Sequence, residues 1–295
     1  MTLAQRLADK WAGWWQAKWQ ASHQLAGPWD RTWLGQARVI ITGASRGIGE
    51  ALAKRLSFYG AHLCLAARST EKVHRLAQHL RTFGRSQIIA LGMDVTKPED
   101  RKLLIDGTVY YLGGLDVLIN NAGVGASGLF EEGSPERLRQ IMETNFFAAV
   151  ELIRLAIPHL EKSPVGGMIV NISSVLGRRG IPGYADYCAS KFALTGFSEA
   201  LRAELVRQGI HVLTVLPGLI DTPFNQHMLE ARFRPPWREP ERMSASQCAR
   251  EIVAAMLKRK NEVVLTAGGK FLVWSNRLLP FVVDWVLARM MRRYP

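Results

Sequence analysis

The chain has 295 residues, and 48% of them are hydrophobic, which excludes a mainly disordered protein and is enough for one large α/β domain or two small ones. Its three cysteines are widely separated, which excludes a disulfide framework or a cysteine-rich metal cluster and favours a reducing compartment. A formal net charge of +13 leaves three classes of partner open, namely an anionic cofactor, an anionic membrane and nucleic acid.

The first 36 residues form a tryptophan-rich segment that holds six of the nine tryptophans. At about 100° per residue, Leu3, Leu7 and Trp11 fall on one half of a helical wheel with three further tryptophans, whereas polar side chains take the other half. Residues 1–36 are therefore predicted to be an amphipathic helical extension. Because polar residues interrupt every apolar stretch there, we expect no secretory signal and a cytoplasmic protein.

A regular alternation of short apolar runs with helical stretches begins at residue 37. Continuous apolar strands separated by helices are typical of a parallel sheet that helices cover on both faces. Residues 37–267 are therefore predicted to form a single doubly wound α/β domain, with a mainly parallel sheet of about seven strands. Six strands are expected at residues 38–41, 62–66, 88–91, 117–119, 168–172 and 211–215, with a weaker seventh at 262–266.

The loop after the first predicted strand reads TGASRGIG over residues 42–49 and is followed by a helical stretch. Its glycines permit a tight turn and a close approach of the backbone to a pyrophosphate, and the helix N-terminus adds N–H donors and partial positive charge. Strand, loop and helix in this order predict a Rossmann-type dinucleotide site. An ordinary turn between a strand and a helix is the alternative.

The end of the second predicted strand indicates which dinucleotide is bound. A carboxylate is expected about 20 residues after the glycines if it holds the ribose 2′-hydroxyl of NAD, but this chain has Ala67 and Arg68 there. Arg68, together with Arg46 of the glycine loop, can pair with a 2′-phosphate. We therefore expect NADP(H) as the cofactor; the alternative is that both arginines are solvated surface charges.

Tyr187 and Lys191 lie four residues apart in a predicted helix, so that both side chains can reach the same cleft. An unperturbed tyrosine has a pKa of about 10 and is a poor base at neutral pH, but a neighbouring cation stabilises its phenolate. This makes Tyr187 a candidate general acid/base, with a chance surface pair of tyrosine and lysine as the alternative.

Together, these motifs resemble those of the short-chain dehydrogenase/reductase family, in consistent order over about residues 38–266. The resemblance rests on the glycine loop, the Tyr-x-x-x-Lys pair and three further matches: Asn-Asn-Ala-Gly at 120–123, Asn145 and Pro-Gly at 217–218. The family's serine is Ser173 or Ser174, and the separation from the tyrosine that is usual in the family, 13 residues, selects Ser174.

The resemblance implies an NADP(H)-dependent oxidoreductase that interconverts a carbonyl and an alcohol. It implies that Tyr187 exchanges a proton with the substrate oxygen, that Ser174 hydrogen-bonds the same oxygen, and that hydride moves to or from the nicotinamide. It assigns Lys191 to the nicotinamide ribose and to lowering the Tyr187 pKa, and Asn145 to anchoring a water in the proton relay. A non-catalytic nucleotide-binding scaffold that uses its extensions for membrane or protein interaction is the alternative.

The expected ligand contacts follow from the motifs and the resemblance together. Ser174 and Tyr187 are expected to contact the substrate. The expected cofactor contacts are Gly43, Ser45, Arg46, Gly47, Ile48, Gly49, Arg68, Asp94, Val95, Asn121, Ala122, Gly123, Tyr187, Lys191, Pro217, Gly218, Ile220 and Thr222. The family's habit of pairing helices, here residues 135–160 and 186–208, implies a homodimer or homotetramer.

Two other classes of ligand are not expected. The seven histidines lack the spacing of metal ligands, so we expect no metal site. The chain contains no recognised nucleic-acid-binding module, so we expect no nucleic-acid partner despite the positive charge.

Two segments outside the motifs bear on the substrate. Residues 219–243 are rich in proline and arginine and too long for an ordinary connection, so we expect a lid. Residues 268–295 are expected to be a basic amphipathic extension. Both extensions can pack on the enzyme or a partner subunit, or they can contact a membrane surface. Packing is favoured, because amphipathic helices more often cover a core. In either case an apolar lip suits a lipophilic carbonyl or alcohol, such as a steroid, a retinoid or an acyl-chain ketone.

Overall fold

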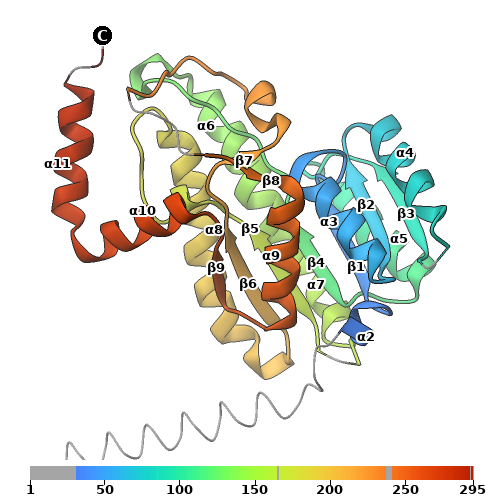
Figure 1. The fold of residues 1–295 in the computed structure, drawn as a ribbon. Coiled ribbons are helices and arrows are strands. Elements are labelled where there is room, and N and C mark those ends of the chain that lie inside the picture. The colour runs from blue at the N-terminus through green and yellow to red at the C-terminus, as the bar shows by residue number, and fades with distance from the viewer. Residues whose placement is uncertain (1–30, 85, 165, 237–240, 293, 295) are drawn as a thin grey trace, which may run out of the picture.

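The computed structural model describes residues 31–84, 86–164, 166–236, 241–292 and 294 (Figure 1). The predicted amphipathic extension, residues 1–36, therefore lies almost wholly outside the described residues, and within its last six residues the structure shows the short helix α2 (Arg31–Leu34). Leu34 is fully buried against the main core, so the chain joins the packed part of the molecule at this residue.

A seven-stranded sheet forms the centre of the molecule, with the strand order β3-β2-β1-β4-β5-β6-β9 (Figure 1). The strands are β1 (Arg38–Thr42), β2 (His62–Ala67), β3 (Ile88–Gly92), β4 (Val117–Asn120), β5 (Met168–Ile172), β6 (His211–Leu216) and β9 (Glu262–Val264). Every neighbouring pair is parallel, which confirms the predicted sheet. The last strand ends earlier than predicted, because the Thr266 hydroxyl accepts a hydrogen bond from Gly269 N at 3.0 Å and caps the next helix.

Helices cover both faces of this sheet and divide the core into two layers. The first layer contains α3 (Gly47–Phe58), α4 (Thr70–Arg81) and α9 (Ala245–Leu257), and the second contains α5 (Pro98–Leu112), α7 (Ala148–Leu160) and α8 (Ala185–Glu204). Val39 and Ile41 of β1 pack into the first layer, whereas Ile40 between them packs into the second. All three side chains are fully buried. Burial of each stabilises the fold by about 1.5–3 kcal/mol, which is why most buried positions of the strands are apolar; Asn171 and Thr214 are among the exceptions.

The strand order reverses between β1 and β4, since the chain leaves β1 toward β2 and leaves β4 toward β5. In an open parallel sheet, ligands bind in the crevice at this reversal, outside the carboxyl ends of the strands. Short helical elements complete the fold: η1 (Phe130–Glu132), α6 (Pro135–Met142), the π-helical η2 (Glu143–Phe147), η3 (Val175–Gly177), η4 (Leu205–Gln208) and η5 (Pro223–His227).

The lid segment has more regular structure than the sequence predicts. Its two ends pair in parallel as β7 (Ile220–Asp221) and β8 (Met243–Ser244). Between them, Glu230 accepts a hydrogen bond from Arg137 Nη1 at 2.9 Å, which attaches the lid to α6. A two-residue strand shows no periodicity, so a sequence pattern cannot predict it.

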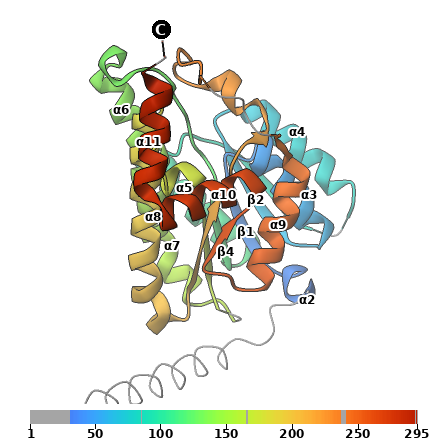
Figure 2. The same ribbon diagram turned by 60° about the vertical axis from the view of Figure 1, so that its left-hand side comes forward.

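Two helices, α10 (Ala267–Leu278) and α11 (Pro280–Met291), form the C-terminal extension and confirm its predicted helical character. The chain bends by 116° between them. Among the described residues no single helix is long and apolar enough to cross a bilayer, although α10 and α11 taken together meet the length and hydropathy criteria. Figure 1 shows α11 to one side of the sheet, and Figure 2 shows α10 leading from the centre of the molecule to it.

Candidate active site

A cavity of about 1090 Å³ lies over the carboxyl ends of the strands, at the reversal between β1 and β4. All of the predicted catalytic and cofactor-binding residues line it except Gly49 and Asn145. The lid and Leu272 of α10 also line it. The structure therefore brings residues from most of the chain to one site, as a crevice between strand ends requires.

The glycine loop has the backbone geometry that its sequence demands. Gly43 and Gly47 have φ angles of 65° and 59°, in the left-handed region that favours glycine. A Cβ on Gly43 would lie 2.9 Å from Ala122 Cα, so no larger residue fits there. A Cβ on Gly49 would overlap the Gly43 carbonyl oxygen. Gly49 therefore allows the first turn of α3 to pack against the glycine loop. Gly49 was predicted to contact the cofactor, but it is not among the residues that line the cavity.

Asn121 connects the glycine loop to the end of β4. Its side-chain amide donates hydrogen bonds to Thr42 O at 2.9 Å and to Gly43 O at 3.2 Å. The Thr42 hydroxyl accepts hydrogen bonds from Asn121 N and Ala122 N, both at 3.0 Å. Asn121 was predicted as a cofactor contact, and the structure adds that it fixes the two loops of this part of the cavity.

Two arginines lie at the end of the cavity nearest β2. Arg46 precedes α3, and Arg68 follows β2 beside the buried Ala67. Burial and, to a smaller extent, the positive charge of Arg68 lower the pKa of the Arg46 guanidinium. Neither arginine forms an ion pair within the described part of the chain. An anionic group between them would relieve this repulsion, so the residues present fit a 2′-phosphate.

Three further predicted cofactor contacts, Asp94, Val95 and Thr222, also line the cavity. Asp94 Oδ1 accepts hydrogen bonds from Thr96 N at 3.0 Å and Thr96 Oγ1 at 2.9 Å, and the next residue, Val95, offers a buried apolar surface. Across the cavity, the Thr222 side chain lies against Gly47, because a Cβ on that glycine would lie 3.2 Å from Thr222 Cβ. The lid therefore begins in contact with the glycine loop.

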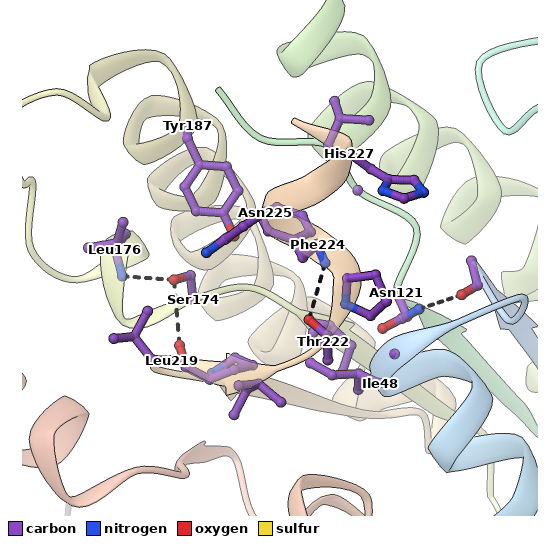
Figure 3. A pocket seen from close by; sticks show the side chains of 18 of the residues that line it. Ile48, Asn121, Ser174, Leu176, Tyr187, Leu219, Thr222, Phe224, Asn225 and His227 are labelled. Carbon is purple, nitrogen blue, oxygen red and sulfur yellow. Dashed lines mark hydrogen bonds between the residues drawn. The ribbon is translucent and has the colours of Figure 1, made fainter. Parts of the chain in front are cut away.

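Tyr187 and Lys191 lie one turn apart on α8, and Ser174 precedes the short helix η3 after β5. Ser174 Oγ accepts a hydrogen bond from Leu176 N at 3.1 Å and donates one to Pro217 O at 3.5 Å. These bonds hold the serine below the Tyr187 ring, as Figure 3 shows. The three predicted catalytic side chains of this group therefore share one part of the cavity.

Ser173, the alternative serine, is buried and already engaged. Its hydroxyl donates to Lys191 O at 3.0 Å and lies 2.8 Å from Thr195 Oγ1. Through Lys191 O and Thr195 Oγ1, this hydroxyl links the end of β5 to α8. Both serines line the cavity, and the Ser174 hydroxyl has two partners of its own, so the choice of Ser174 stays a prediction that rests on its separation from Tyr187.

Burial changes the pKa of both titratable catalytic groups. It raises the pKa of the Tyr187 phenol, while a hydrogen bond with Ser174 acts in the opposite direction. It lowers the pKa of the Lys191 ammonium to about 8. Lys191 Nζ lies 5.7 Å from the centre of the Tyr187 ring. The lowering of the Tyr187 pKa by Lys191, which the resemblance implies, stays a prediction.

The Lys191 ammonium has one hydrogen bond among the described residues, to Ile172 O at 2.9 Å. An ammonium carries three N–H donors, so two of them remain for a ligand in the cavity. A Cβ on Gly123 would lie 3.7 Å from Nζ, which places the end of the Asn-Asn-Ala-Gly motif next to this cation.

Asn145 is buried behind the cavity, within the π-helical η2. Its side-chain nitrogen donates to Val124 O at 2.9 Å and to Ser190 Oγ at 3.0 Å, and its oxygen accepts from Val124 N at 2.8 Å. Both amide hydrogens are used, so the side chain connects the loop after β4 to the catalytic helix α8. The water that the resemblance assigns to Asn145 stays a prediction.

Several apolar residues of the cavity were not predicted individually. The Phe224 ring centre lies 5.9 Å from that of Tyr187, and Figure 3 shows the two rings side by side. Leu272, Met228 and Tyr184 also line this side. No motif marks such residues, since a lid sequence does not reveal which side chains turn inward. The only signal was the length of the segment at residues 219–243.

Comparisons with known proteins agree with this geometry. Residues 37–232 match the family described as short chain dehydrogenase. A curated relative, 11-beta-hydroxysteroid dehydrogenase-like 2 of Arabidopsis thaliana, is 35% identical over 250 residues, which cover 84% of this chain and 80% of the relative.

Two solved structures represent the fold with different cofactors. A short chain dehydrogenase from Burkholderia cenocepacia in complex with NADP has a TM-score of 0.71 and 26% identity, and the likeness covers 84% of this chain and 96% of that one. A short chain dehydrogenase/reductase from Burkholderia phymatum in complex with NAD has a TM-score of 0.74 and 24% identity, with 84% and 95% covered, which is a likeness of fold alone. Fold and site therefore agree that the chain is a nicotinamide-dependent oxidoreductase belonging to the short-chain dehydrogenase/reductase family.

Proposed function

We propose that this protein is an NADP(H)-dependent oxidoreductase that interconverts a carbonyl and an alcohol on a lipophilic substrate. The proposal is supported above all by the meeting of Tyr187, Ser174 and Lys191 in one cavity that also contains the glycine loop. A nucleotide-binding scaffold has no chemical need for this set of side chains, which argues against the non-catalytic alternative.

When bound, the cofactor supplies a hydride to a carbonyl carbon or accepts one from an alcohol. Ser174 donates a hydrogen bond to the substrate oxygen, and Tyr187 donates a proton to the same oxygen as negative charge develops on it. Because burial raises the Tyr187 pKa, the phenol is protonated at neutral pH and can act as the acid of the reduction. In the oxidation the same oxygen atom of Tyr187 takes the hydroxyl proton.

Lys191 and the two arginines are the cofactor-binding cations of this proposal. The two remaining N–H groups of Lys191 hydrogen-bond the hydroxyls of the nicotinamide ribose. Arg46 and Arg68 bind the 2′-phosphate, and Ala67 stands where a carboxylate would favour NAD. These residues support NADP(H) as the cofactor.

The substrate end of the cavity supports a lipophilic substrate. Phe224, Leu272 and Met228 surround the space beside Tyr187 with apolar side chains. Relatives named as hydroxysteroid dehydrogenases point the same way. We therefore propose a steroid-like or other large apolar carbonyl compound, or the matching alcohol, as the substrate class.

The Tyr187→Phe variant tests the catalytic assignment. We expect kcat/KM for the NADPH-dependent reduction of a steroid ketone to fall by about 10²–10⁴-fold, because the proton donor is lost. The affinity for NADPH, measured by fluorescence titration, should change little, since the ring and its packing beside Phe224 are kept. Tyr111→Phe, at an exposed tyrosine of α5, serves as the control. A Tyr187→Phe variant with the same kcat/KM as the parent would contradict the catalytic assignment of Tyr187.

A substrate panel tests the rest of the proposal. It runs from steroid ketones and acyl-chain ketones to hydrophilic sugars, each with NADPH and with NADH. Faster turnover of the sugars would contradict the lipophilic substrate class. Tight binding of NADPH without turnover of any member of the panel would favour the scaffold alternative.

A further inference from the structure

The two C-terminal helices carry a row of exposed aromatic and aliphatic side chains. On α10, Phe271, Trp274 and Leu278 recur at a spacing of three and four residues, which places them on one face. Their exposed fractions are 75%, 57% and 68%. On α11, Phe281 and Trp285 are one turn apart and are exposed by 69% and 62%. We call these five residues the C-terminal patch.

Side-chain contacts link the helices that carry this patch to the rest of the protein. Arg179, in the loop between β5 and α8, donates hydrogen bonds to Asn276 Oδ1 at 3.0 Å and to Asp284 Oδ1 at 2.5 Å. Beyond α11, the Tyr294 ring stacks on Phe233 of the lid with 4.9 Å between ring centres. The polar side of each helix therefore faces the protein, and the patch is left outside.

The charge around the patch is positive. Residues 267–295 contain five Lys+Arg and one Asp, and that single acid, Asp284, is already paired with Arg179. The Arg277 guanidinium lies 5.8 Å from the Trp274 ring, and the Arg289 guanidinium lies 5.7 Å from the Trp285 ring. Tryptophan and arginine side by side on an apolar helix are typical of the boundary between lipid tails and headgroups.

The patch also adjoins the cavity described above. Gly269 and Leu272 of α10 line the cavity, while Phe271 and Trp274 on the same helix are exposed. One helix therefore connects the substrate end of the cavity with the outer apolar surface.

We propose that the C-terminal patch docks on the surface of an anionic phospholipid bilayer, with the substrate end of the cavity next to the lipid. The helices lie in the headgroup region, their aromatic rings enter the acyl boundary, and the arginines contact anionic headgroups. Entry of lipophilic substrates from the bilayer into the cavity rests on the proposed function. The docking of the patch on the bilayer does not depend on it.

The positive charge around the C-terminal patch favours a bilayer over a second copy of the chain as its binding partner. Two copies that met through this patch would bring like-charged groups such as Arg277 and Arg289 toward each other, and the one acid of these two helices, Asp284, already has Arg179 as a partner. Like-charge contacts oppose such pairing, whereas an anionic lipid surface complements the same charges.

Vesicle sedimentation tests the proposal. The full chain is mixed with vesicles of phosphatidylcholine alone, or with about one third phosphatidylserine. The patch variant combines F271S, W274S, F281S and W285S, none of which lines the cavity. Its matched control combines F58S, F83S, Y110S and Y111S, which are exposed by 60–81% at other places.

We expect the parent to bind phosphatidylserine vesicles more tightly than neutral ones, with binding weakened by salt. The patch variant should bind at least about tenfold more weakly, and the control should bind like the parent. Hydrogen exchange with and without vesicles localises the contact, and α10 and α11 should gain protection. Hydrogen exchange therefore distinguishes vesicle binding through the C-terminal patch from vesicle binding through the tryptophans of residues 1–36.

Three results would each overturn the proposal: no binding of the parent to anionic vesicles, equal binding of the patch variant, or protection that leaves out α10 and α11. A parent that is dimeric without vesicles, and a patch variant that is monomeric, would identify a second copy as the occupant instead. Turnover of a water-soluble ketone is measured in parallel. A parent that binds vesicles but reduces no carbonyl contradicts the proposed function and leaves the docking intact.

Discussion

At the scale of residues, burial gives the catalytic pair its properties. The same desolvation raises the Tyr187 pKa and lowers that of Lys191, because it disfavours the phenolate and the ammonium alike. The pair is therefore closer to neutral than free side chains would be, and the cavity favours proton donation by Tyr187. A cofactor that carries negative charge would reinforce the protonated form of Lys191.

The Lys191 pKa of about 8 predicts a pH dependence of cofactor binding. Below this pH the ammonium is already protonated in the free protein and can hydrogen-bond the ribose. Above it, binding requires the uptake of a proton, so the Kd for NADPH should rise by about tenfold between pH 8 and pH 9.5. Fluorescence titration across this range checks the expectation. Lys191→Met should bind more weakly but without the rise; a parallel rise in both proteins would rule out Lys191 as its cause.

Arg68→Asp tests the preference for NADP(H). The change removes one partner of the 2′-phosphate and introduces a carboxylate that repels it, while a ribose 2′-hydroxyl can still be bound. We expect the Kd for NADPH to rise by at least about tenfold and the Kd for NADH to rise less or to fall. Arg154→Asp, at an exposed arginine of α7, is the charge-matched control. Equal effects of Arg68→Asp on both cofactors would contradict the assignment.

The residues that could be predicted from the sequence are those whose chemistry requires one residue type at one position. Gly43 and Gly47 need left-handed backbone, and Tyr187 and Lys191 need helical spacing. Phe224 could not be predicted, because many apolar residues can fill that place and its direction depends on the folded lid. Gly49 was predicted as a contact because motif spacing does not distinguish packing from binding.

At the scale of elements, one buried ion-pair cluster connects the lid to the catalytic helix. Arg137 Nε donates to Asp186 Oδ2 at 2.6 Å, and its Nη1 donates to Glu230 Oε2 at 2.9 Å. Asp186 directly precedes Tyr187 at the start of α8, and Glu230 belongs to the lid. Arg137 on α6 therefore positions both, although it does not line the cavity.

Arg137→Met is expected to destabilise the protein strongly. The Arg137 and Asp186 side chains are exposed by only 5% and 6%, so the substitution leaves a buried carboxylate without its partner, at a cost of about 3–5 kcal/mol. Urea denaturation measures this loss. Glu230→Gln should cost much less, because Glu230 is 24% exposed and a glutamine oxygen can still accept the hydrogen bond. A loss for Arg137→Met no larger than that for Glu230→Gln would refute the account.

Elements were predictable where burial determines the sequence. The five inner strands of the sheet are buried on both faces, so each is mostly a run of apolar residues between turn residues. The pairing of β7 with β8 was not predictable, since it depends on contacts between the two ends of the lid. The end of β9 was shifted by a local cap, the Thr266 hydroxyl, which competes with the strand for the same residues.

At the scale of the whole molecule, the net charge is concentrated at the two ends of the sequence. Residues 1–38 contain five Lys+Arg against two Asp+Glu, and residues 258–295 contain eight against two. The residues between them therefore contribute only +4 of the total of +13. Arg46, Arg68 and Lys191 lie in the cavity, where an anionic cofactor would meet them, so nucleic acid is not needed to explain the charge.

The placement of the C-terminal helices could not be predicted from the sequence. Their helical character follows from composition, but the position of α11 depends on the contact of Arg179 with Asp284, which are 105 residues apart. The sequence also left open whether Trp285 faces the cavity, and the structure shows it exposed and outside the cavity lining. Such long-range contacts arise only once the sheet has brought the two segments together.

The stacking of Tyr294 on Phe233 has a consequence for movement. Phe233 belongs to the lid, and Tyr294 follows α11, so one pair of rings couples the lid, which lines the cavity, to a helix that does not. An outward swing of the lid must either separate the rings or pull α11 with it. If the lid opens to admit substrate, we therefore expect the rates of substrate entry and product release to depend on the motion of a helix that contributes no residue to the chemistry.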